Sequence, residues 1–124
     1  MPARILVVDD DAVIREMLVV FLQGEGYSVV TAPDGKDGFQ MAQDDEPNLI
    51  ITDLQMGDWS GTDLLTALRK AHILVPTILI TGTASDPDFA AAHSAFDALI
   101  SKPFRLEDAL NTIHRFLPPQ PKSA

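Results

Sequence analysis

The 124-residue sequence contains no cysteine, so disulfide bonds and thiolate metal sites are excluded. Basic residues are also scarce, because 9 Lys and Arg stand against 18 Asp and Glu and give a formal charge of −9. This excess of acid argues against direct contact with nucleic acid or with an anionic membrane. It favours a cationic ligand instead, such as a divalent metal ion.

The sequence also lacks long hydrophobic runs. Its longest uninterrupted apolar stretch, Met17 to Leu22, is far too short to cross a bilayer. The first residues lead directly into a strand-like run and show no signal-peptide pattern. We therefore expect a cytoplasmic protein. Because 46% of the residues are hydrophobic, the chain is expected to form one compact domain with a core of its own.

A strand-like run with an acid at its end lies near the middle of the sequence. Leu49, Ile50 and Ile51 follow a proline and precede a glycine-containing loop, a pattern typical of a short strand buried on both faces of a parallel sheet. Asp53 lies at the carboxyl end of this run. A carboxylate at the edge of an apolar layer is costly unless it is solvated, paired or bound to a metal. Asp53 is therefore a candidate functional residue.

Strand-like and helix-like patterns alternate along the sequence. Apolar runs predict strands at residues 5–8, 27–32, around Ile51, at 76–81 and at 98–101. Helical spacing predicts helices from Asp10 or Asp11 to Gly24 or Gly26, around Phe39 to Ala42, from Ser60 or Gly61 past Leu68, from Pro87 to Ala95, and from Leu106 to Leu117. Five strands alternating with five helices predict an α/β fold, a doubly wound parallel sheet with helices on both faces.

Polar side chains follow four of the five predicted strands. They are Asp9, Asp10 and Asp11 after the first strand, Asp53 at the third, Thr81 at the fourth and Lys102 at the fifth. In a doubly wound sheet, ligands bind outside these carboxyl ends. Converging carboxylates repel one another unless a cation joins them, and Mg²⁺ prefers such oxygen ligands. The alternative for the aspartate triplet is a helix N-cap with solvated neighbours, but an acid on another strand favours the metal.

Thr81 and Lys102 also have ordinary interpretations, as a β-branched strand residue and as a surface lysine before a turn. Combined with the acids, they form a set suited to phosphoryl chemistry. The metal and the ammonium neutralise phosphoryl oxygens, the hydroxyl donates a hydrogen bond, and a carboxylate attacks. The three histidines have neither metal-ligand spacing nor triad partners.

Five motifs in the same order make the chain resemble a response-regulator receiver domain of two-component signal transduction. They are residues 5–11 (ILVVDDD), 32–35 (APDG), 50–61 (IITDLQMGDWSG), 80–82 (ITG) and 102–104 (KPF). The resemblance covers residues 4–117. It implies a flavodoxin-like strand order of 2-1-3-4-5, with residues 1–117 as the receiver domain. The proline-rich composition of residues 118–124 indicates a tail or an interdomain linker. The alternative for the tail is a frayed terminus.

The resemblance also implies roles for individual residues. Asp53 corresponds to the phosphoacceptor, which takes a phosphoryl group from a sensor histidine kinase or a phosphotransfer protein. Asp10, Asp53 and the main-chain carbonyl of Gln55 would bind Mg²⁺, and Asp9 would act largely through water. Thr81 corresponds to the switch hydroxyl and Lys102 to the phosphate-pairing lysine.

Finer expectations follow from the same family pattern. The peptide bond between Lys102 and Pro103 is expected to be cis. Gln55 and Thr83 lie where family members vary, and they are expected to tune the lifetime of the phosphoryl group. The domain is not expected to be an enzyme beyond its own phosphorylation and dephosphorylation. Its expected partners are the kinase, an unknown output partner or effector domain, and a second copy in a phosphorylation-dependent homodimer. It is expected to act either as a stand-alone regulator or as the input domain of a longer one.

Four positions depart from the family pattern. Gly57 replaces a proline after the phosphoacceptor, so this loop is expected to be less pre-organised. Ser60 and Gly82 replace an aspartate and an alanine, and Leu99 replaces the aromatic residue of the fifth strand. Two alternative functions stand beside the receiver. One is a degenerate receiver that acts only as an interaction module, and the other is a metal-dependent phosphatase of small molecules.

Overall fold

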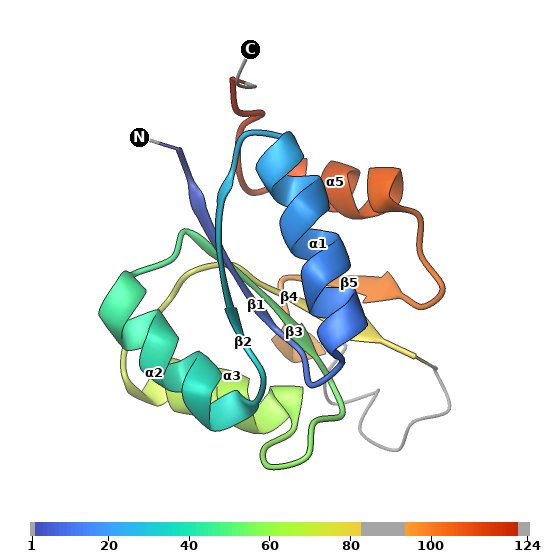
Figure 1. Ribbon diagram of the computed structural model, residues 1–124. Coiled ribbons are helices and arrows are strands. Elements are labelled where there is room, and N and C mark those ends of the chain that lie inside the picture. The colour runs from blue at the N-terminus through green and yellow to red at the C-terminus, as the bar shows by residue number, and fades with distance from the viewer. Residues whose placement is uncertain (1, 83–93, 122–124) are drawn as a thin grey trace.

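The computed structural model describes residues 2–82 and 94–121, and its elements form a parallel sheet between helices (Figure 1). The strands are β1 (Arg4–Val8), β2 (Ser28–Ala32), β3 (Leu49–Asp53), β4 (Thr77–Thr81) and β5 (Ala98–Ser101). The helices are α1 (Ala12–Gly24), α2 (Gly35–Asp45), α3 (Gly61–Lys70) and α5 (Leu106–His114).

The five strands are all parallel in the order β2-β1-β3-β4-β5, which confirms the predicted doubly wound, flavodoxin-like sheet. The described residues contain four of the five expected helices. The remaining one, expected from Pro87 to Ala95, falls mostly on residues 83–93, which lie outside the described part of the chain.

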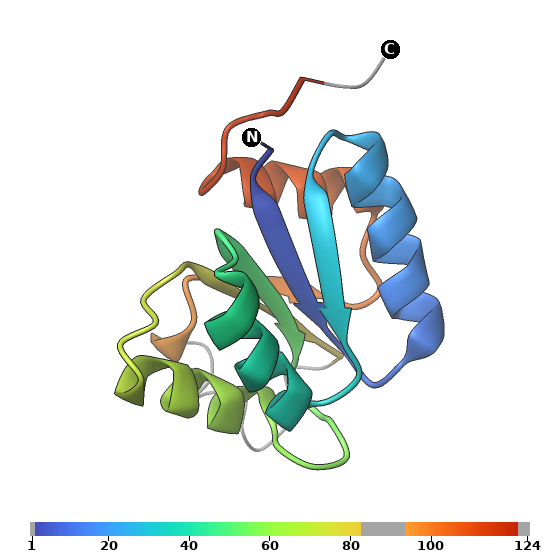
Figure 2. The same ribbon diagram turned by 60° about the vertical axis from the view of Figure 1, so that its left-hand side comes forward.

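Alternation along β1 sends side chains to both faces of the sheet. Ile5 and Val7 pack in a cluster with residues of α1 and α5, whereas Leu6 and Val8 pack with residues of α2 and α3. Figure 2 shows the same division, with α1 and α5 on one side and α2 and α3 on the other. Because successive strand side chains point to opposite faces, a continuous apolar run is buried on both. Burial contributes roughly 1.5–3 kcal/mol for each such side chain.

Polar caps fix where the helices begin. Helix α1 starts after Asp11, whose side chain accepts hydrogen bonds from the amides of Val13 and Ile14 at 2.9 and 3.4 Å. Helix α3 starts after Ser60, which forms a capping box with Asp63. The choice of Asp11 as cap leaves Asp10 outside the capping contacts. No helix in the described ranges combines the length and apolarity that a membrane span requires.

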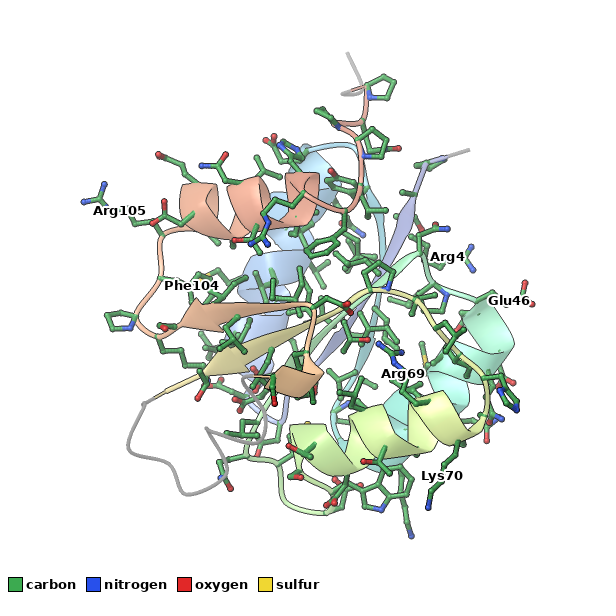
Figure 3. All side chains as sticks on the ribbon, turned by 180° about the vertical axis from the view of Figure 1, so that it is seen from behind. Arg4, Glu46, Arg69, Lys70, Phe104 and Arg105 are labelled. Atoms are coloured by element: carbon green, nitrogen blue, oxygen red, sulfur yellow. The ribbon has the colours of Figure 1, made fainter. Side chains whose placement is uncertain are left out.

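Arg69 contacts two loops at the end of the sheet opposite the predicted site. Its guanidinium donates to the carbonyls of Ile73 and Val75 at 2.7 and 3.3 Å and lies 3.5 Å from the carboxylate of Asp97. Figure 3 shows Arg69 directed toward the sheet, while its neighbour Lys70 extends into solvent. The loops that lead into β4 and β5 are thereby held together at this end.

The described part of the proline-rich tail, residues 118–121, lies against the domain. The hydroxyl of Tyr27 donates to the carbonyl of Pro118 at 3.2 Å, and the side-chain carbonyl of Gln120 accepts from the amide of Ala3 at 3.0 Å. Both chain ends lie at the same end of the molecule in Figure 1. The linker role of residues 118–124 stays a prediction.

Candidate functional site

Three carboxylates meet at the carboxyl edge of the sheet. One oxygen each from Asp9, Asp10 and Asp53 lies within 4.8 Å of the other two. Asp9 follows β1 and Asp53 ends β3, and the two strands are neighbours paired at Val8 and Thr52. Asp9 and Asp53 are buried, whereas Asp10 is exposed. The parallel topology therefore concentrates negative charge at one point of the surface.

Asp9 is the most deeply buried of these acids, with 1% of its surface exposed. Its Oδ1 accepts from the amide of Asp11 at 2.9 Å, and its main-chain carbonyl accepts from the guanidinium of Arg15 at 2.7 Å. Among the described residues, its buried Oδ2 has no hydrogen-bond partner. Burial, with added repulsion from Asp53 and Asp10, raises the pKa of Asp9 to about 6, although the Asp11 amide and Lys102 oppose the shift. This carboxylate is thus incompletely satisfied.

Asp53 is paired with a cation from the edge strand of the sheet. Its Oδ1 accepts from the amide of Leu54 at 2.9 Å and from Nζ of Lys102 at 3.5 Å. Burial raises the pKa of Asp53, and Lys102 together with the Leu54 amide offsets only part of the shift. Lys102 directly follows β5, and its peptide bond to Pro103 is cis, as expected.

Thr81 ends β4 at the same edge and is 2% exposed. Its neighbour Ile80 is in register with Asp53, and its own carbonyl accepts from the amide of Lys102 at 2.8 Å. The structure thus brings Thr81 and Lys102 to the edge where the three acids meet. Gln55 is exposed, two residues beyond Asp53, and Thr83 lies outside the described residues.

Gly61 allows the loop after Asp53 to return to the strand end. A Cβ at this position would overlap the main-chain oxygen of Asp53. The amide of Gly61 donates to the carbonyl of Leu54 at 2.8 Å and closes the loop. Because any side chain would push α3 away from β3, this approach requires glycine.

Sequence reasoning missed two residues near the site, Arg15 and Asp58. Arg15 lies one turn after the N-cap of α1, and this spacing was the available signal for its contact with the end of β1. Asp58 accepts hydrogen bonds from the amides of Gly35 and Lys36 at the start of α2. No periodicity links Asp58 to that helix, so the contact had no signal in the sequence.

The donor set suits a hard divalent cation. It offers carboxylate oxygens from two strand ends, among them the buried Oδ2 of Asp9 that has no partner in the described chain. Oxygen ligands of this kind suit Mg²⁺, which commonly uses one or two carboxylates and keeps several of its waters. The residues present therefore fit Mg²⁺.

The family model of the response regulator receiver domain matches residues 5–114. The probable transcriptional regulatory protein TcrX of Mycobacterium tuberculosis is 32% identical over 117 residues, which make up 94% of this chain and 50% of that protein. Response regulator MprA of Mycolicibacterium vanbaalenii is 35% identical over 118 residues, 94% of this chain and 51% of that protein. The chain spans about half the length of these relatives.

Solved structures give the same result. Chemotaxis response regulator CheY4 of Vibrio cholerae superposes with a TM-score of 0.85 at 31% identity, covering 94% of this chain and all of that one. Response regulator TrrA of Thermotoga maritima, in complex with Mg²⁺ and BeF, has a TM-score of 0.84 at 30% identity over 93% of this chain and 99% of that one. The chain therefore belongs to the response regulator receiver domains, the phosphorelay switches of two-component signal transduction.

Proposed function

We propose that Asp53 accepts a phosphoryl group from the phosphohistidine of a sensor histidine kinase or a phosphotransfer protein. The observation that carries this proposal is the carboxylate of Asp53 at a strand end, 3.5 Å from Nζ of Lys102 and beside the carboxylates of Asp9 and Asp10. In this arrangement the carboxylate of Asp53 attacks and Nζ of Lys102 pairs with the phosphoryl oxygens. The remaining acids help to hold a metal ion.

The transfer is a displacement at phosphorus. A carboxylate oxygen of Asp53 forms the new P–O bond, while the P–N bond breaks and its electron pair returns to the imidazole. Within the described chain, hydrogen bonds to this carboxylate go to Oδ1, which leaves Oδ2 for the attack. Lys102 pairs with a phosphoryl oxygen, and the hydroxyl of Thr81 donates a hydrogen bond to another. When bound, Mg²⁺ supplies further positive charge to these oxygens.

Asp10, Asp53 and the main-chain carbonyl of Gln55 would hold the Mg²⁺, with Asp9 acting through water. Adding Mg²⁺ to about a hundredfold excess over its dissociation constant is expected to raise the free energy of unfolding by about 2.7 kcal/mol, because it binds only the folded state. The Asp10→Asn variant should respond much less. Urea unfolding with and without Mg²⁺ measures both responses. Equal, metal-independent midpoints in the two proteins would exclude the site.

The proposed function is tested by incubating the protein with a small phosphodonor such as acetyl phosphate. Intact mass is expected to show one added phosphoryl group that is stable in acid, is lost in base and requires Mg²⁺. A protein that gains no phosphoryl group, or gains one equally in the presence of a chelator, would refute the proposal.

The finer properties of the switch belong to the same proposal. The domain accepts, holds and loses its phosphoryl group and changes its partner surface, without turnover of a separate substrate. Its partners are the kinase, an output partner or effector domain reached through residues 118–124, and a second copy when phosphorylated. Its location is the cytoplasm. Membership of the receiver family disfavours the alternative of a phosphatase of small molecules.

Leu99 is expected to keep an inward rotamer when the site is activated. It is half-buried in β5, packs against a cluster that includes Leu79 and Phe96, and lines a cavity of about 210 Å³. Full burial of a leucine contributes roughly 1.5–3 kcal/mol, so exposing this half-buried side chain gives up part of that, and leucine has no hydroxyl that gains a partner in solvent. We expect large methyl and amide shift changes to be confined to residues 82–95, part of which lies outside the described chain. A rotamer flip of Leu99 on adding beryllofluoride and Mg²⁺ contradicts this.

A further inference from the structure

The carboxylate of Asp58 caps a helix that is distant in the sequence. Its Oδ1 accepts from the amide of Gly35 and its Oδ2 from the amide of Lys36, each at 3.0 Å. These amides open α2, where the first N–H groups of a helix have no partner within it. The local N-cap, Asp34, covers the amide of Asp37 at 2.8 Å. Asp58 therefore completes a cap that Asp34 leaves unfinished.

Electrostatics support the same contact. The start of a helix carries partial positive charge and favours a carboxylate. Slight burial raises the pKa of Asp58, but the hydrogen bonds from the amides of Lys36, Gly35 and Trp59 outweigh burial and lower it. Asp58 is thus held in its charged form at neutral pH, in which both oxygens accept hydrogen bonds.

Trp59 provides a second contact between the same loop and α2. Its ring lies 6.1 Å from that of Phe39, between centroids. A Cβ at Gly35 would come within 2.6 Å of Cβ of Trp59. Glycine at the start of α2 is therefore what lets the loop approach closely. The loop and the helix fit together through both backbone and side chains.

Met56, in the middle of this loop, packs against the cluster that contains Leu6 and Val8, and its sulfur accepts from the hydroxyl of Thr52 at 4.0 Å. The loop leaves β3 after Asp53, passes through Gln55 and Gly57, and closes where the amide of Gly61 bonds to the carbonyl of Leu54. A Cβ at Gly57 would meet nothing within 4 Å, so the chain is not packed there. Beyond Gly57, the described contacts that hold the loop on α2 are those of Asp58 and Trp59.

We infer that Asp58 is a positioning residue for the metal site, which holds the loop on α2 so that the main-chain carbonyl of Gln55 stays at the edge where Asp10 and Asp53 lie. This inference rests on the proposed function, in which that carbonyl is a ligand of Mg²⁺. Asp58 contacts neither the phosphoryl group nor the metal and acts through the loop. Its contact also replaces the stiffness that a proline at residue 57 would provide.

Calorimetric titration of Mg²⁺ into the metal-free protein tests the inference. Asp58→Ala removes both acceptor oxygens, and the dissociation constant is expected to rise about 10-fold, as for other residues that orient metal ligands. Gly35→Ala keeps every charge but pushes Trp59 away, and it is also expected to raise the dissociation constant for Mg²⁺. Asp58→Asn, which keeps one acceptor oxygen, should fall between wild type and Asp58→Ala.

Asp37→Asn is the matched control, because it removes an exposed charge from the same first turn of α2 without touching the loop. It should keep the wild-type dissociation constant. Amide exchange at Gly35 and Lys36, measured without metal, reports whether the cap is lost. Faster exchange with weaker Mg²⁺ binding supports the inference. Faster exchange in Asp58→Ala with an unchanged dissociation constant overturns it. An equal loss of Mg²⁺ affinity in Asp37→Asn also overturns it. Wild-type protein that binds no Mg²⁺ refutes the proposed function itself.

Discussion

The Asp53→Asn variant is expected to gain no phosphoryl group under conditions in which the wild-type protein gains one. The amide that replaces the carboxylate is a poor nucleophile, and no other acid in the site lies at a strand end paired with Lys102. The variant should fold normally, because removing one of three crowded negative charges relieves repulsion. Intact mass after incubation with acetyl phosphate and Mg²⁺ measures the difference, and circular dichroism confirms the fold.

Asp11→Asn is the control for this experiment. Asp11 carries the same charge two residues from Asp9, but its side chain caps α1, and asparagine caps a helix about as well. This variant should be phosphorylated like the wild type. A phosphoryl group that persists in Asp53→Asn, or that maps to His72 or His114, would falsify the assignment.

Much of the fold was predictable because its signals are local. The apolar runs at residues 5–8 and 98–100, each flanked by polar or turn residues, specify strands without reference to the rest of the chain. Strand boundaries were harder to predict where a contact outside the sheet decides them. Tyr27 was expected to open β2, but its amide donates to the carbonyl of Leu22 in α1 at 3.1 Å, and the strand begins at Ser28. The tail itself has no periodicity, so its contacts had no signal in the sequence.

The location of the site could be predicted from the sheet topology together with the residue types at the strand ends. Once the strands are parallel, the groups that follow them must share one edge, so the meeting of Asp9, Asp10 and Asp53 could be expected without coordinates. Contacts between loops cannot be derived in this way. Asp58 lies on the loop after β3 and Gly35 at the start of α2, and which of the many acids in this chain reaches that helix depends on the path of the backbone. Such contacts determine how firmly a site is held.

Protonation of Asp9 is expected to raise the free energy of unfolding of the metal-free protein as the pH falls from neutral. The pKa of Asp9 is about 6 in the folded chain and near 3.8 ordinarily. The folded state therefore binds the proton more tightly than the unfolded state, and linkage raises the free energy of unfolding as pH falls through 6 toward 4. At neutral pH the charged group costs on the order of 3 kcal/mol. Urea unfolding in a chelator over this pH range measures the change.

The Asp9→Asn variant removes that cost and should be more stable than the wild type at neutral pH without metal. The gain should be about 1 kcal/mol, because the new amide can keep the bond from Asp11 but buries N–H donors that the carboxylate lacked. Near pH 4 the advantage should vanish, since Asp9 is then protonated. Saturating Mg²⁺ should reverse the order, because the wild type alone presents the full set of acids to the cation. A variant that is less stable than wild type in chelator at neutral pH would show that burial of the charge at Asp9 carries no cost.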